Sequence, residues 1–166
     1  PIDVSPANGV PDYVDRTGES CEYAWTTEVT NLGYLAPQLS GGPNNKYLIQ
    51  YQNQQSYGFT SVISGVRTRI VLHPNFSGFP PIDDPEGDQL GALGVTIAHE
   101  FKHASQIMYS SWSEGGWVEL DATWMEDIPY DNANDYYTYL RGSGSPFTEP
   151  QVSLDVGGTG SYEDVN

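Results

Sequence analysis

The first half of the chain alternates apolar and polar residues with two different periods. Apolar residues at helical spacing predict a helix over residues 12–32, which ends near Gly33. Three later segments are rich in β-branched and aromatic residues and predict strands, at residues 46–51, 57–63 and 68–73. The last of these segments is the clearest strand, because Thr68, Ile70 and Val71 are all β-branched.

The second half returns to helical spacing after an acidic loop at residues 80–88. Helices are predicted at residues 89–109, 117–126 and 131–141, with a Gly-Gly break between the first two. Residues 142–166 are rich in Gly, Ser and Pro, have little periodicity and predict a loop-rich tail. Strands followed by helices in a chain of 166 residues predict a single α+β domain.

The predicted helix at residues 89–109 has two chemically different faces. One face is an apolar stripe suited to the core, made of Ile97, Phe101, Ala104 and Met108. The nearly opposite face carries His99, His103 and Gln106. A helix that packs on one side and presents two imidazoles on the other suits the floor of a cleft.

His99-Glu100-Phe101-Lys102-His103 matches the H-E-x-x-H pattern of zinc peptidases. Residues four apart on a helix lie on one face, so His99 and His103 can bind one ion together. Glu100 stands beside that ion, where it can take a proton from water. Chance spacing of an exposed His pair is the alternative, and the chain has only three His in total.

A catalytic zinc ion commonly takes three protein ligands, so a third ligand is needed downstream. Three acidic residues of the predicted helix at 117–126 compete for this role: Glu119, Asp121 and Glu126. Glu119 is favoured and Glu126 is the next choice, because both share a helix face with Thr123. A solvated acidic face remains the alternative for all three. Trp117, Leu120 and Trp124 lie on the opposite face and are predicted to anchor this helix in the core.

The chain is strongly acidic, with 22 acidic and six basic residues and a net charge of −16. This sign disfavours nucleic acid and anionic membrane surfaces as partners. No apolar run is long enough to cross a bilayer. The single Cys21 cannot form a disulfide within the chain and predicts a buried, inert thiol. The chain begins at Pro1 without Met, as a processed or trimmed chain would, and we expect a secreted monomer.

At the zinc motif and Glu119 the chain resembles the gluzincins, the thermolysin-like zinc peptidases. It is most similar to uncharacterised secreted bacterial proteins classed as metalloproteases. Besides the zinc motif, the resemblance rests on four segments: Asn8-Gly-Val-Pro-Asp-Tyr-Val-Asp15, Leu32-Gly-Tyr-Leu-Ala-Pro37, Ala122-Thr-Trp-Met-Glu-Asp127 and Asn134-Asp-Tyr-Tyr137. It implies a zincin-like fold in which a small mixed sheet has a backing helix, an active-site helix and a glutamate helix. A peptide would lie along an edge strand, for which residues 68–73 are the candidate.

The resemblance also implies a set of metal-binding residues. Zinc would bind His99, His103 and Glu119, and Thr123 stands where thermolysin relatives use Asp to orient the first His. Residues 8–15 resemble a calcium-binding loop, which would use Asn8, Asp12 and Asp15. An ordinary turn with a helix cap is the alternative there. Family members continue beyond this chain, so we expect a fragment of a larger protein.

Together these features predict a zinc-dependent endopeptidase that uses Glu100 as general base on a peptide or protein substrate. The oxyanion donor is predicted to be Tyr136 or Tyr137 in the helix at residues 131–141. The alternative is a non-catalytic, secreted adhesion or surface module with a structural metal site.

Overall fold

The computed structural model describes residues 3–39, 43–113, 115–137, 140, 145 and 147–152. Helix α1 (Asp12–Ala24) continues directly into a π-helical segment, η1 (Trp25–Asn31), and a 3₁₀ turn, η2 (Pro43–Asn45), follows. The strands are β1 (Ile49–Tyr51), β2 (Gly58–Ser64) and β3 (Arg67–Leu72), and two long helices come after them, α2 (Asp88–Ser110) and α3 (Trp117–Asp127). The predicted α+β class is confirmed.

The three strands form a mixed sheet in the order β1-β3-β2. β1 pairs with β3 in parallel, with Ile49 opposite Ile70, and β2 pairs with β3 antiparallel, with Gly58 opposite Leu72. The prediction that residues 68–73 form an edge strand is therefore wrong, because β3 is hydrogen-bonded on both sides. Its β-branched residues mark the centre of the sheet, and β2 is the edge strand that lies next to α2.

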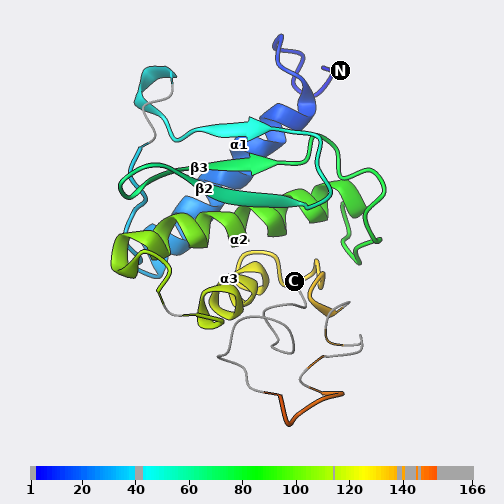
Figure 1. Cartoon of the computed structure of the whole chain (residues 1–166). Helices are drawn as coiled ribbons and strands as arrows, with labels where there is room; N and C mark the ends of the chain where they lie inside the picture. The colour runs from blue at the N-terminus through cyan, green and yellow to red at the C-terminus, as the bar shows by residue number, and fades with distance from the viewer. Residues whose placement is uncertain are drawn as a thin grey trace.

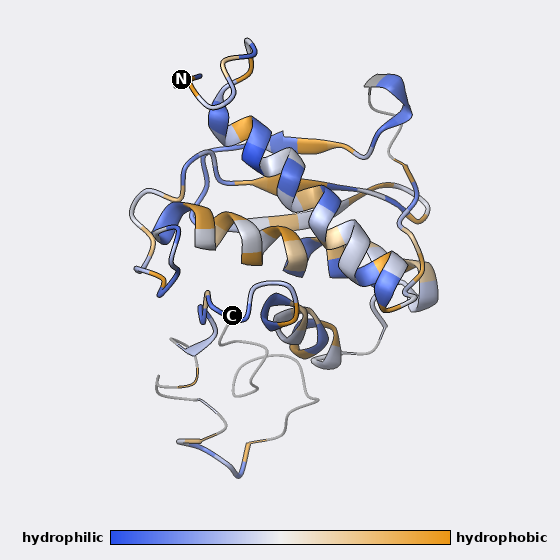
Figure 2. Ribbon diagram, turned by 180° about the vertical axis from the view of Figure 1, so that it is seen from behind, coloured by the Kyte–Doolittle hydropathy of each residue, from blue (hydrophilic) through white to orange (hydrophobic). Residues whose placement is uncertain are grey.

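The three helices occupy different places around the sheet. α1 crosses behind the sheet, α2 runs below it beside β2, and α3 lies on the far side of α2 (Figure 1). Seen from behind, the outer face of α1 is largely hydrophilic, whereas apolar segments gather on α2 and the strands (Figure 2). The main core joins Ile70 and Leu72 of the sheet to Leu93, Ile97 and Phe101 of α2. The predicted apolar stripe of α2 is thus confirmed at Ile97, Phe101 and Ala104, while Met108 is only partly buried.

The predicted helix at residues 12–32 is confirmed, but its last turns are π-helical. η1 ends before Gly33, whose φ of 78° few other residues adopt readily. Single π-helical turns often occur at functional sites. In this one Glu28 points inward, is fully buried, and neither of its carboxylate oxygens has a hydrogen-bond partner among the described residues.

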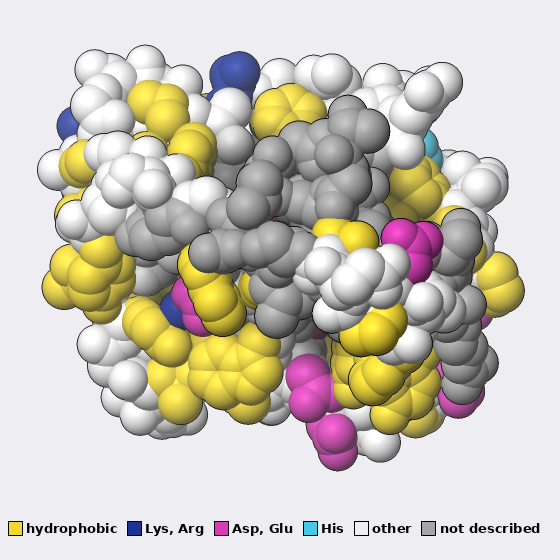
Figure 3. Space-filling model, turned by 60° about the horizontal axis from the view of Figure 1, so that its bottom comes forward, with side chains coloured by type: hydrophobic (Ala, Val, Ile, Leu, Met, Phe, Trp, Pro, Cys, Tyr) yellow, Lys and Arg dark blue, Asp and Glu magenta, His cyan; other side chains and the backbone are white. Residues whose placement is uncertain are grey.

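Helix α3 packs on α2 with the face opposite to the one predicted. Ala122 and Met125 are fully buried, whereas Trp117 and Trp124 are 54% and 48% exposed. The prediction that these Trp residues anchor the helix is wrong. The close contact between α2 and α3 is filled by smaller side chains and by acidic residues of α3. Hydrophobic side chains accordingly gather on the surface in the view onto this side of the molecule (Figure 3).

The chain after α3 differs from the predicted helix at residues 131–141. Residues 131–136 form turns, with Asn134 at a positive φ of 47°, and helical hydrogen bonding begins only at Tyr137. Residues 138, 139 and 141 lie outside the described part, as does most of the predicted tail at 142–166. None of the described helices is long and apolar enough to span a membrane.

Candidate metal centre

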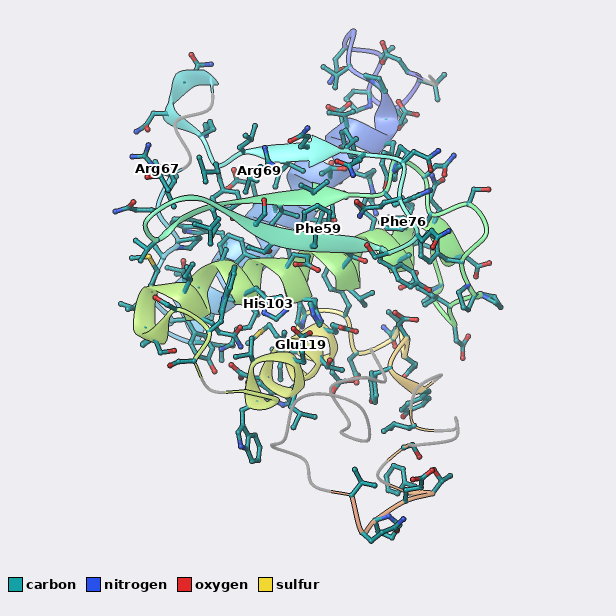
Figure 4. All side chains as sticks on the ribbon, viewed as in Figure 1. Phe59, Arg67, Arg69, Phe76, His103 and Glu119 are labelled. Carbon is teal, nitrogen blue, oxygen red and sulfur yellow. The ribbon has the colours of Figure 1, made fainter. Side chains whose placement is uncertain are left out.

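Three side chains from α2 and α3 converge on one point. Nε2 of His103 lies 3.0 Å from Nε2 of His99, and the Glu119 carboxylate lies 3.2 Å from His99 Nε2 and 3.4 Å from His103 Nε2. One ligand atom from each of the three residues lies within 4.8 Å of the others. His103 points down from α2 toward Glu119 on α3 (Figure 4). The favoured ligand set of the sequence is therefore assembled in space.

The remaining ring nitrogens are held by oxygen acceptors. Nδ1 of His99 donates to Glu126 Oε1 at 2.6 Å, and Nδ1 of His103 donates to Gln106 Oε1 at 2.8 Å. Both Nε2 atoms consequently face each other and the Glu119 carboxylate. Such an arrangement needs a proton or a metal cation between the ligand atoms, and two imidazoles with one carboxylate are a zinc donor set.

Gln106 is itself fixed by two further hydrogen bonds. Its amide donates to Val118 O at 2.9 Å and to Asp121 Oδ2 at 3.0 Å, so its oxygen must face His103. The buried Lys102 ammonium lies 3.1 Å from the same Asp121 oxygen and 3.1 Å from the ring centre of Tyr34. This network ties the orientation of His103 to the contact between α2 and α3.

Glu100 lies beside the three ligands without joining them. Its side chain is buried, and its Oε2 accepts a hydrogen bond from Thr60 Oγ1 on β2 at 2.9 Å. The same hydroxyl also donates to the backbone oxygen of Glu100 at 2.7 Å, so its one hydrogen is shared between the two acceptors. Gly58, on the same strand, allows this approach, because a Cβ there would lie 2.7 Å from Thr96 Cγ2 and 3.3 Å from Glu100 Cγ.

A cavity of about 670 Å³ opens over the centre. Residues 55–60, which lead into and begin β2, line one side, and His99, Glu100, His103 and Glu119 line the other. Phe79, Val95 and Trp112 add apolar surface to the walls. The site thus has the partly apolar, concave form typical of small-molecule and substrate sites.

The charges of the centre stabilise one another. Burial alone would lower the pKa of His99, but hydrogen bonds with Glu119 and Glu126 hold its pKa well above the ordinary value. Burial alone would raise the pKa of Glu119, but hydrogen bonds with His103 and His99 hold its pKa well below the ordinary value. Both pKa shifts arise because the imidazoles and the carboxylates lie close together. The negative charge of these carboxylates also favours a metal cation.

Two other residues predicted on α3 have different surroundings. Glu126, the alternative ligand, binds Nδ1 of His99 and so lies on the far side of the ring from Glu119. Thr123, the predicted orienting residue, has a buried hydroxyl to which no residue in the described part of the chain makes a hydrogen bond. The orienting contact with His99 is therefore made by Glu126.

The predicted oxyanion donors do not reach the cavity. Tyr136 and Tyr137 pack on each other, with ring centres 4.7 Å apart, and neither is among the residues that line it. A hydrogen bond links Tyr136 to Asp127 instead. Cys21 is partly buried against the core rather than fully buried, and burial raises the pKa of its thiol to about 12, which makes it a poor nucleophile.

The candidate calcium loop is held by its own hydrogen bonds. Asp12 Oδ1 accepts from the backbone N–H groups of Val4 and Ser5, at 2.8 and 3.2 Å. The amide of Asn8 donates to Asp15 Oδ2 at 3.1 Å, so it presents nitrogen rather than oxygen to this carboxylate. These hydrogen bonds are those of a turn that leads into the first turn of α1, which is the alternative to a calcium-binding loop.

Sequence reasoning missed Thr60, the role of Gln106 and the acidic side chain of Asp135, which lines the cavity. Gln106 could have been found, since it stands three residues after His103 on the same helix. Thr60 and Asp135 carry no such local signal, because each reaches the site from a separate element.

No protein-family model, curated protein or solved structure matches the chain. The candidate metal centre is therefore defined by its own geometry: two imidazoles and a carboxylate are directed at one point, and each imidazole is oriented by a second oxygen.

Proposed function

We propose that the chain is a zinc-dependent endopeptidase of the gluzincin type with a zincin-like fold. The observation that carries this proposal is the meeting of His99, His103 and Glu119 at a cavity that Glu100 also lines. The three ligands come from only two helices, and the cavity leaves room for a substrate above them. Secretion and a monomeric state stay predictions from the sequence.

The residues around the centre fit a division of labour. Zinc bound by His99, His103 and Glu119 would supply Lewis-acid chemistry, activating a water molecule and polarising the scissile carbonyl. Glu100 takes the proton of the attacking water and delivers it to the leaving amine. The Thr60 hydroxyl holds the Glu100 carboxylate toward the cavity, and the surrounding apolar walls limit competing water.

The edge strand β2 suits an extended peptide substrate. Gly58, Phe59 and Thr60 line the cavity directly beside Glu100 and the two His residues. An edge strand can pair with the backbone of an extended peptide, which brings a peptide bond to a fixed place without regard to side chains. This role, predicted for residues 68–73, belongs to β2 in the proposal.

The test uses Glu100→Gln, which keeps the shape of the side chain and removes its basicity. Zinc-loaded wild-type protein is expected to cleave members of a mixed quenched-fluorescence peptide library. The variant is expected to bind one equivalent of zinc with similar affinity and to lose cleavage by at least about a hundredfold. Full cleavage by Glu100→Gln would remove Glu100 from the mechanism.

A chelator separates catalysis from a structural metal module. Structural zinc sites are usually closed by four protein ligands, whereas the described residues supply a group of three. In the catalytic case chelation stops cleavage and lowers the melting temperature modestly. A metal-dependent fold with no cleavage of any library peptide would favour the non-catalytic module.

A further inference from the structure

Four carboxylates line the cavity, and three of them already have a task. Glu119 faces the two Nε2 atoms, Glu126 holds His99, and Glu100 is bound by Thr60. The fourth is Asp135. The described lining includes no Lys or Arg that could balance them.

Asp135 is buried and has no partner in the described part of the chain. Its side chain lines the cavity, the residue is only 8% exposed, and it makes no hydrogen bond or ion pair with a described residue. Burial, together with the nearby Glu126, raises the pKa of Asp135 to about 6, and His99 opposes the rise. Because Asp135 lines the cavity, its carboxylate can be reached from there, and a ligand that enters can complete its hydrogen bonding.

The position of Asp135 is fixed by the turn that follows α3. The Ala133 N–H donates to Tyr130 O at 2.8 Å, and Asn134 takes a left-handed conformation just before Asp135. Tyr130 packs against α2 at Gly94, where a Cβ would lie 2.7 Å from its ring. The turn is therefore anchored to the helix that carries His99, and Asp135 is presented to the cavity by built structure.

We propose that Asp135 is a specificity-determining residue that binds a cationic group of the substrate, namely a Lys or Arg side chain or a free α-ammonium group. The inference deepens the proposed function and rests on it for the identity of the substrate. An ammonium or guanidinium group entering the cavity would give Asp135, which is 8% exposed, a charge-assisted hydrogen bond. The net charge of −16 would also draw such substrates toward the protein.

The experiment measures binding apart from cleavage. Zinc-loaded Glu100→Gln protein is titrated with fluorescent peptides of one frame, in which lysine or norleucine is placed at each position in turn. Each peptide is made with a free and with an acetylated N-terminus, which separates the side chain from the α-ammonium group. At least one cationic peptide is expected to bind about tenfold or more tightly than its neutral partner.

Asp135→Asn in the same Glu100→Gln background is expected to bring that ratio close to one. Asp131→Asn is the matched control, because Asp131 is an exposed acid in the same stretch of turns. This substitution removes one negative charge, as Asp135→Asn does. It should leave the ratio intact. Asp135→Ser serves as a second variant if Asp135→Asn fails to bind zinc.

Each outcome decides the proposal. The proposal is overturned if every cationic peptide binds no more tightly than its neutral partner, or if no peptide binds measurably. It is also overturned if the full preference is retained without the Asp135 carboxylate. Cleavage of the same peptides by wild-type protein is measured separately. If the cationic preference depends on Asp135 but no peptide is cleaved, the peptidase proposal is rejected and the role of Asp135 is retained. If peptides are cleaved without any cationic preference, the peptidase proposal is retained and the role of Asp135 is rejected.

Discussion

Glu126 and His99 form the shortest hydrogen bond of the metal centre, with 2.6 Å between Oε1 and Nδ1. Glu119, seven residues earlier on α3, lies 3.2 Å from the other nitrogen of the same ring. Two turns of one helix therefore place a carboxylate on each side of one imidazole. Glu119 faces the point where a metal would bind, and Glu126 fixes the tautomer and the direction of the ring.

Replacing Glu126 should weaken metal binding although it is not a ligand. Glu126→Ala frees the His99 ring and removes the acceptor for its Nδ1–H, so the zinc dissociation constant is expected to rise about 10–100-fold. Competition with a chromophoric chelator measures this constant. Thr123→Val is the control, because the Thr123 hydroxyl has no hydrogen-bond partner within the described ranges, and it should change the constant less than about twofold. A large loss confined to Thr123→Val would return the orienting role to Thr123.

The Thr60 hydroxyl should affect catalysis without affecting metal binding. Thr60→Val keeps the shape of the side chain but leaves Glu100 Oε2 without its donor at 2.9 Å. A hydrogen bond to a charged group contributes roughly 1.5–3 kcal/mol, so kcat/KM is expected to fall about tenfold or more. Thr60→Ser retains the hydroxyl and should stay close to wild type. If Ser and Val variants lose the same activity, packing rather than the hydrogen bond positions Glu100.

The sequence predicted best what lies within one helix. The apolar stripe of α2 and the spacing of His99 and His103 depend only on helical periodicity, so residues 97–104 could be placed without tertiary information. Helical periodicity also favours Glu119 over Asp121, which points away from it, while Glu126 shares its face but lies almost two turns further along.

What the sequence could not predict depends on how the elements meet. Both β2 and β3 are rich in residues typical of strands, and nothing local tells that β3 lies between its neighbours. On α3 the large apolar Trp117 and Trp124 suggested the buried face, yet the metal centre and the contact with α2 occupy the same face. The side chains between the helices must therefore include Glu119 and Glu126, and the Trp residues are left outside.

Gly58 should be the most restrictive glycine of the site. Gly58→Ala would bring a Cβ to 2.7 Å from Thr96 Cγ2 and 3.1 Å from Val71 O. We expect a loss of about 1–3 kcal/mol in the free energy of unfolding, measured by urea denaturation. The loss should be smaller in a Thr96→Ser background, which removes the closest atom. Gly18→Ala is the control of opposite sign, since a Cβ there meets no atom of the described residues within 4 Å and Ala favours the helix.

Glu28 should make stability depend on pH in an unusual direction. Burial raises the pKa of this carboxyl from 4.5 to about 9, although the nearby Lys102 opposes the rise. In the folded protein Glu28 therefore keeps its proton through neutral pH, whereas in the unfolded chain it has lost the proton above about pH 4.5. Folding binds a proton in this window, so the free energy of unfolding falls as the pH rises, by up to about 1.4 kcal/mol per pH unit.

Glu28→Gln removes this proton uptake and leaves a neutral side chain of the same shape. Its stability relative to wild type is expected to increase steadily between pH 5 and about pH 9 in urea unfolding series, because only the wild type must retain the proton to fold. Glu22→Gln is the matched control, since Glu22 is exposed on α1, and its difference from wild type should stay constant over the same range. A Glu28→Gln difference that is flat or shrinks with pH would mean that Glu28 is ionised in the fold. Lys102 would then have to neutralise Glu28 as well as Asp121, whose carboxylate lies 3.1 Å from its ammonium.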